Sequence, residues 1–99
     1  YTDTRNFPNP VSMDNEVTIA FRSDNNDWSV KIFDFSGKEI ITLTSAKNIS
    51  ARRDGDYQLV TWDCSKKGTK VTPGIYLGFV ERSFEGQSYK ERLKIAVVE

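Results

Sequence analysis

Histidine is absent from this sequence of 99 residues, and cysteine occurs only once. Without histidine, the Ser/His and Cys/His arrangements that activate a nucleophile are excluded, and the commonest ligand of zinc, copper and non-haem iron is missing. Catalysis would have to rest on carboxylates, lysine or tyrosine, and no pair of carboxylates stands in a context that indicates an acid and a base. The sequence therefore predicts no enzyme, no metal site and no cofactor.

An intrachain disulfide is also excluded, because Cys64 has no second cysteine to pair with. A lone thiol in an oxidising compartment is normally buried or joined to another chain. We expect Cys64 to be buried.

Excess charge of either sign is lacking as well, since 14 Lys and Arg residues balance 14 Asp and Glu residues. No overall field then draws the protein to nucleic acid or to an anionic membrane surface. No apolar run approaches the roughly 20 residues of a membrane-spanning helix, so no membrane span is predicted. The polar opening at residues 1–5 is not a signal peptide, and we expect one upstream if the parent protein is exported.

What the sequence does contain is apolar and polar residues in alternation, interrupted by turns rich in Gly, Asn and Asp. This period of two is typical of strands that bury one face, and a chain of this length forms one domain, here residues 1–99. We expect six strands, and a seventh at an edge if residues 3–7 pair. The six lie at 16–22, 28–32, 40–43, 57–62, 74–82 and 88–98.

Two longer polar stretches, residues 45–56 and 63–73, are predicted to be loops. Six to seven short strands with such connections predict an all-β fold, an antiparallel immunoglobulin-like β-sandwich, with a small barrel as the alternative. The Cys-Trp-Cys spacing of antibody domains is missing, so the pattern indicates the architecture and not that family.

Several segments resemble parts of a bacterial C-terminal module. In the first half these are Asn6-Phe7-Pro8-Asn9-Pro10 and Val30-x-Ile32-Phe33-Asp34-x-x-Gly37-Lys38, and in the second half Trp62-Asp63, Gly68, Val71, Pro73-Gly74-Ile75-Tyr76 and Lys94. The pattern is similar to two related families, the C-terminal sorting domain of type IX secretion cargo and the immunoglobulin-like domain named after the flagellar hook-capping protein. The chain departs from the second pattern at Cys64, where glycine usually follows Trp-Asp.

The resemblance implies a non-catalytic accessory module of a larger exported bacterial protein, placed at its C-terminus and serving secretion sorting, cell-surface attachment or assembly. The implied location is secreted or at the cell surface. The implied partner is a protein of the secretion or surface machinery, or a neighbouring domain of the parent chain, with a surface polysaccharide as an alternative partner. A carbohydrate-binding module of a secreted glycoside-degrading enzyme is the alternative function, because aromatic residues make up 12% of the chain.

Most residues of the motifs have a structural interpretation. Pro8 and Pro10 fix φ and remove two N–H donors, so their segment can border a sheet without inviting further strands. We expect Gly37 to adopt positive φ and Gly74 to let the chain bend after Pro73. The Tyr76 hydroxyl is expected to bond to loop backbone, as in the tyrosine corner of sandwich domains.

The last strand carries a short basic stripe, which is better explained as a solvated face than as a contact with an acidic partner or a surface polysaccharide. Likewise, residues 24–27 are better explained as a turn than as a calcium loop, and Trp28 and Trp62 as core residues than as a sugar platform. The candidate motif and recognition residues are Pro8, Asn9, Pro10, Gly37, Trp62, Asp63, Gly74, Tyr76, Lys90, Arg92 and Lys94.

Overall fold

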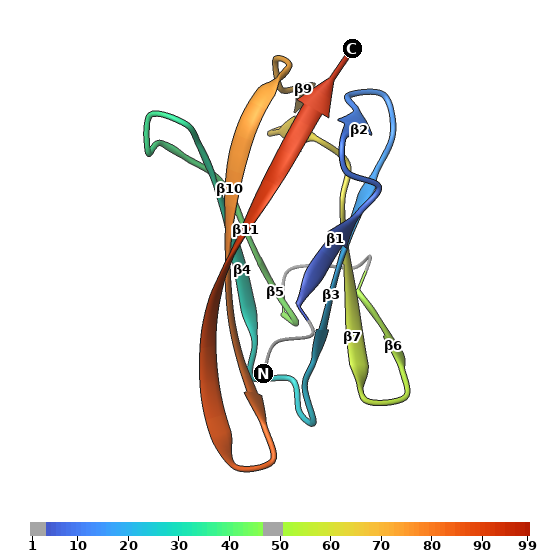
Figure 1. The fold of residues 1–99 in the computed structure, drawn as a ribbon, viewed down its shortest axis with the longest axis vertical. Coiled ribbons are helices and arrows are strands. Elements are labelled where there is room, and N and C mark those ends of the chain that lie inside the picture. The colour runs from blue at the N-terminus through green and yellow to red at the C-terminus, as the bar shows by residue number, and fades with distance from the viewer. Residues whose placement is uncertain (1–3, 47–50) are drawn as a thin grey trace.

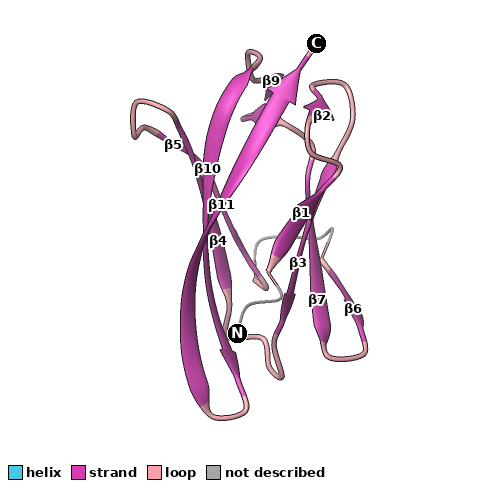
Figure 2. Ribbon diagram, in the orientation of Figure 1, coloured by secondary structure: helices cyan, strands magenta, loops and turns pink. Residues whose placement is uncertain are grey.

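The computed structural model describes residues 4–46 and 51–99, and all regular structure in this part of the chain is β. Two sheets face one another as a β-sandwich, as Figure 1 and Figure 2 show. The predicted all-β, immunoglobulin-like sandwich is thereby confirmed. No helix that could span a membrane occurs among the residues described.

The smaller sheet has four strands and the larger has five. The smaller contains, in spatial order, β1 (Arg5–Phe7), β3 (Val17–Arg22), β7 (Tyr57–Trp62) and β6 (Arg52–Asp54). The larger contains β2 (Val11–Ser12), β11 (Gln87–Val98), β10 (Gly74–Phe84), β4 (Ser29–Asp34) and β5 (Glu39–Thr44). A separate small hairpin joins β8 (Ser65–Lys66) to β9 (Thr69–Lys70).

The core lies between the sheets and is built mainly from alternate residues of the longer strands β3, β4, β7, β10 and β11. Its largest aromatic contacts are edge-to-face, with Trp62 against Tyr76 at 5.8 Å between ring centroids and Phe21 against Trp28 at 5.7 Å. Burying side chains of this kind contributes about 1.5–3 kcal/mol each. Trp28, Trp62 and Cys64 are all buried, as the sequence predicts.

All six predicted main strands are present, and the conditional seventh is β1. The prediction of a loop over residues 45–56 is wrong for Arg52–Asp54, which pairs with β7 as β6. All three side chains of β6 are exposed, so it lacks the alternation that marks a half-buried strand. Residues 47–50 of that loop lie outside the described residues. The predicted loop at 63–73 likewise contains the β8–β9 hairpin.

One pair of strands departs from the expected antiparallel arrangement. After β1 leaves the smaller sheet, the segment Pro8-Asn9-Pro10 carries the chain to the larger sheet, where β2 pairs parallel to the end of β11. The Phe7-Pro8 and Asn9-Pro10 peptide bonds are both cis. The N-terminal part of the chain therefore borders both sheets in turn.

The backbone at Cys64 accounts for the glycine that the hook-cap pattern has at this position. Cys64 has a φ of 61°, in the left-handed region that glycine adopts without strain. The residue directly follows β7, and its side chain is fully buried. This chain has cysteine at that position, and the thiol fills part of the core.

We predict that Tyr76→Phe lowers the free energy of unfolding by about 1 kcal/mol, the usual value of one hydrogen bond. The Tyr76 hydroxyl donates to the Thr72 carbonyl oxygen at 2.6 Å, and the ring itself is buried. Urea denaturation of both proteins measures the difference. Tyr89→Phe is the matched control, because within the described chain no hydrogen bond is recorded for the Tyr89 hydroxyl. An equal loss in both variants would contradict the assignment.

Candidate recognition surface

The Pro8-Asn9-Pro10 segment lies against one side of β11 and is held there by an amide side chain. Asn9 Oδ1 accepts from the Ala96 backbone N–H at 2.9 Å, and Asn9 Nδ2 donates to the Lys94 carbonyl oxygen at 3.3 Å. Asn6 Nδ2 donates to that same oxygen at 3.2 Å. Since proline has no N–H to offer, the asparagine amide supplies the donor and acceptor that a paired strand would supply.

Trp62 and Asp63 shape the turn that follows β7. Trp62 Nε1 donates to the Ser65 carbonyl oxygen at 3.0 Å inside the core, and Asp63 Oδ1 accepts from the Ser65 backbone N–H at 3.2 Å. The Lys70 ammonium donates to the Asp63 carbonyl oxygen at 2.6 Å. Both motif residues are thus occupied by contacts within the domain.

The two motif glycines differ in what the backbone requires of them. Gly37 has a φ of 93°, as predicted, in a turn whose amides at Ser36 and Lys38 donate to Asp34 Oδ1. The Ser36 hydroxyl donates to the same oxygen. These hydrogen bonds, above all the one from the Ser36 hydroxyl, hold the pKa of Asp34 below its ordinary value. Gly74 starts β10 without positive φ and with open space where a Cβ would lie, so the predicted bend does not depend on glycine.

The basic stripe lies on the outer face of the larger sheet. Lys90, Arg92 and Lys94 are exposed and alternate along β11 with Tyr89, Glu91 and Leu93, which point the other way. No ion pair to any of the three cations is recorded in the described part of the chain. The three cations therefore form one solvent-facing row.

Beside this row lies an apolar column that the sequence analysis missed. Ile75, Leu77 and Phe79 alternate with the buried Tyr76, Gly78 and Val80 on β10, so they face outward and are only half-buried. Leu77 stands opposite Lys94 on one side and Phe33 of β4 on the other. The outer patch is defined here as Phe33, Ile75, Leu77, Phe79, Lys90, Arg92 and Lys94. The near-continuous apolar run over residues 75–80 was the signal that could have revealed it.

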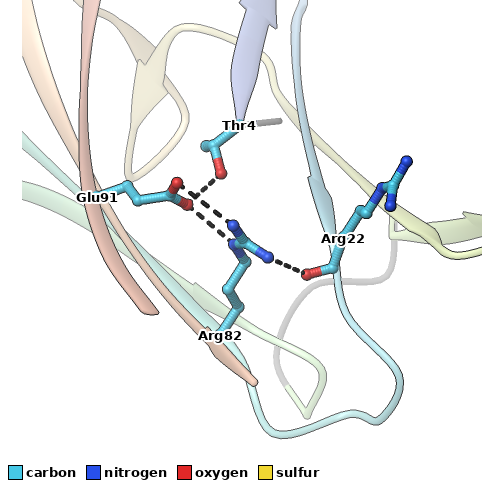
Figure 3. Close-up of polar contacts among 4 residues, drawn as sticks. All are labelled: Thr4, Arg22, Arg82 and Glu91. Atoms are coloured by element: carbon cyan, nitrogen blue, oxygen red, sulfur yellow. Dashed lines mark hydrogen bonds and ion pairs between the residues drawn. The ribbon is translucent and has the colours of Figure 1, made fainter. Parts of the chain in front are cut away.

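A buried arginine holds the far half of the β10–β11 hairpin against the smaller sheet (Figure 3). The Arg82 side chain is fully buried, and its Nε and Nη2 donate to the two carboxylate oxygens of Glu91 at 2.9 and 3.3 Å. Its Nη1 donates to the Arg22 carbonyl oxygen, at the end of β3, at 2.8 Å. The Thr4 hydroxyl donates to Glu91, and the Tyr89 ring covers the guanidinium at 4.3 Å.

Arg82, Glu91, Arg22, Thr4 and Tyr89 together form the Arg82 clamp, which lowers the pKa of Glu91. Desolvation by itself raises the pKa of Glu91, but hydrogen bonds from Arg82 and Thr4, with the charge of Arg82, outweigh it and hold the pKa below its ordinary value. Glu91 lies between Lys90 and Arg92 on β11, so the clamp also fixes the strand that carries the basic stripe.

Two observations bear on metal binding and on nucleophilic chemistry. In the described ranges no group of three or more His, Cys, Asp or Glu residues could hold a metal ion. Burial raises the pKa of the Cys64 thiol, which opposes formation of a reactive thiolate.

Fold and surface together define a small immunoglobulin-like sandwich domain with one basic and apolar outer face. Residues 5–96 match the family described as the secretion system C-terminal sorting domain. The chain belongs to this family, which directs bacterial proteins through type IX secretion to the cell surface or the medium. No curated protein matches the sequence.

Several solved structures share this fold. The chain is similar to part of PorZ of Porphyromonas gingivalis, a surface component of the type IX secretion system, with 24% identity and a TM-score of 0.66. It is also similar to part of latent, dimeric PorU of that organism, with 27% identity and a TM-score of 0.65. The match covers 98% of this chain but 12% of PorZ and 9% of PorU. CopC of Methylosinus trichosporium, at 14% identity and a TM-score of 0.63 over 93% of its length, shares the fold.

We predict that the stability of the domain falls as the pH drops below about 4.3, the ordinary pKa of a glutamate, in part because Glu91 becomes protonated. The folded pKa of Glu91 is lowered, so its contribution is present above the unfolded pKa and is lost as the pH falls through the folded one. Glu91→Gln should lower the free energy of unfolding near neutral pH by about 1–2 kcal/mol and flatten its dependence on acid.

Urea midpoints measured from pH 7 to pH 3 test this prediction. The control variant is Glu39→Gln, which removes a carboxyl from an exposed position on β5 and should keep the wild-type acid dependence. If Glu91→Gln retained the full wild-type dependence, the role given to the clamp would be wrong.

Proposed function

We propose that this domain is a non-catalytic sorting module, carried at the C-terminus of a larger exported protein and recognised by the export machinery as a folded unit. The observation that carries the proposal is the extent of the family match: residues 5–96 include almost the whole sandwich, from the start of β1 to Ala96, two residues before the end of β11. A signal that needs both sheets is a surface of the folded domain and not a short linear peptide, because residues distant in the sequence form each outer face. Attachment of the parent protein to the cell surface belongs to the same proposal.

The absence of histidine from the sequence supports the non-catalytic assignment, because it removes the usual general base. The alternative of a carbohydrate-binding module is weaker. Its best stacking residues, Trp28 and Trp62, are 5% and 1% exposed, so neither ring is available to a sugar.

We predict that a reporter protein fused to the N-terminus of residues 1–99 is exported by a bacterium with a type IX secretion system. The signal is expected to be the fold, so an Ile95→Asp fusion, which buries a charge in the core, should stay inside the cell. Export is measured as the reporter fraction at the surface and in the medium. The unfused reporter and a strain without the secretion system are the controls.

Two results would count against the proposal. If the unfused reporter left the cell as efficiently as the fusion, the domain would have no sorting role. If the wild-type fusion and the Ile95→Asp fusion were exported equally, recognition would not require the folded unit.

A further inference from the structure

The outer face of the larger sheet has the composition of a covered face, yet no part of the described chain covers it. A strand buried on both faces carries apolar residues at successive positions, whereas a strand with one solvated face alternates. Residues 75–80 of β10 follow the first pattern, with Ile75, Leu77 and Phe79 pointing outward. The strand is therefore suited to a second contact, outside the sandwich.

The outer face of the smaller sheet differs in this respect. Ala20 and Leu59, paired across β3 and β7, alternate with core residues and so face outward. Both are nonetheless buried, with exposures of 4% and 9%. Apolar residues on that face are thus shielded within the domain itself, while the column on β10 is only partly buried.

The charge around the apolar column has one dominant sign. Phe79 stands between Arg92 on β11 and Lys31 on β4, and Leu77 stands beside Lys94. Two acids border the same face, Glu81 opposite Lys90 at the end of the column and Glu39 of β5 opposite Phe33, against the four cations Lys31, Lys90, Arg92 and Lys94. The whole chain carries no net charge, so the balancing acids lie mainly elsewhere and leave this face locally positive.

We propose that the outer patch docks onto a protein surface of the export machinery that presents carboxylates beside apolar side chains. This inference rests on the function proposed above and names the face and the partner chemistry. Cations would pair with the carboxylates at the rim of the contact, and the column of Ile75, Leu77 and Phe79 would form its apolar centre.

Other occupants fit the patch less well. A second copy bound by the same face would bring two rows of cations together, which is repulsive. The rings of Phe33 and Phe79 meet edge to face at 86°, so they form no flat platform on which a sugar could stack. The apolar side chains are half-buried between their neighbours and do not project, which suits a complementary protein surface better than insertion into lipid.

The test uses the reporter fusion with two double variants of the patch. Arg92→Glu with Lys94→Glu reverses the charge, and Leu77→Thr with Phe79→Thr replaces the apolar centre with residues that favour strands. Each is expected to reduce the exported fraction about tenfold, the effect of losing about 1.4 kcal/mol of binding. Thermal unfolding must show that each variant remains folded at the temperature of the assay.

The matched control carries Arg52→Glu and Phe7→Thr. It changes one exposed cation and one exposed aromatic residue on strands of the smaller sheet, so its export should equal that of the wild type. If both patch variants were folded and exported normally while the wild-type fusion depended on the secretion system, the docking face would be wrong and the sorting function would stand. If the wild-type fusion itself failed to be exported, the sorting function would fall.

A photo-reactive residue in place of Leu77 identifies the occupant in the same cells. The expected product joins residue 77 to a machinery protein at a segment containing Asp or Glu, and the Arg92→Glu, Lys94→Glu pair should abolish it. Lysines in place of those acids should restore both the product and export. The proposal would be overturned by a product with a second copy, with the parent chain or with lipopolysaccharide. It would also be overturned if an exported fusion gave no product.

Discussion

The register between β10 and β11 is the constraint on which the other features depend. Glu85 and Gly86 form a two-residue turn, both with positive φ, of 52° and 78°, a geometry that matches the twist of the flanking strands. From this turn the pairing runs without interruption to Gly74 opposite Val97. A shift of one residue would exchange inner and outer faces along the whole hairpin, placing the core residues in solvent and the basic stripe in the core.

The same register places the ion pair of Arg82 and Glu91 inside the sandwich. The pair is stable there only because its polar atoms have hydrogen-bond partners. Burial of an unpaired arginine or glutamate would be strongly destabilising. Arg82 avoids this by its two-point contact with Glu91, by the Arg22 carbonyl oxygen and by the ring of Tyr89. These partners come from both sheets, so the clamp also fixes how the sheets meet at the end of the domain opposite the β8–β9 hairpin.

Much of this was predictable from the pattern of residues. Alternation located all six main strands and the exposed row at Lys90, Arg92 and Lys94, and the lack of a second cysteine indicated that Cys64 is buried. The pattern failed at Arg52–Asp54, where an edge strand buries no side chain and so leaves no period to detect. It also failed for the apolar column at Ile75, because a strand with apolar residues on both faces looks the same whether one or both faces are covered.

Periodicity and composition specify the class of the fold, the inner and outer faces of the strands that alternate, and the lack of histidine-based chemistry. The tertiary structure is needed to show that Arg82 meets the Arg22 carbonyl oxygen and that Glu91 meets Thr4, because these contacts join elements far apart in the sequence. Only it decided that the basic stripe of β11 borders the apolar column of β10. Each such neighbour relation depends on the pairing partner of a strand, which alternation within that strand does not specify.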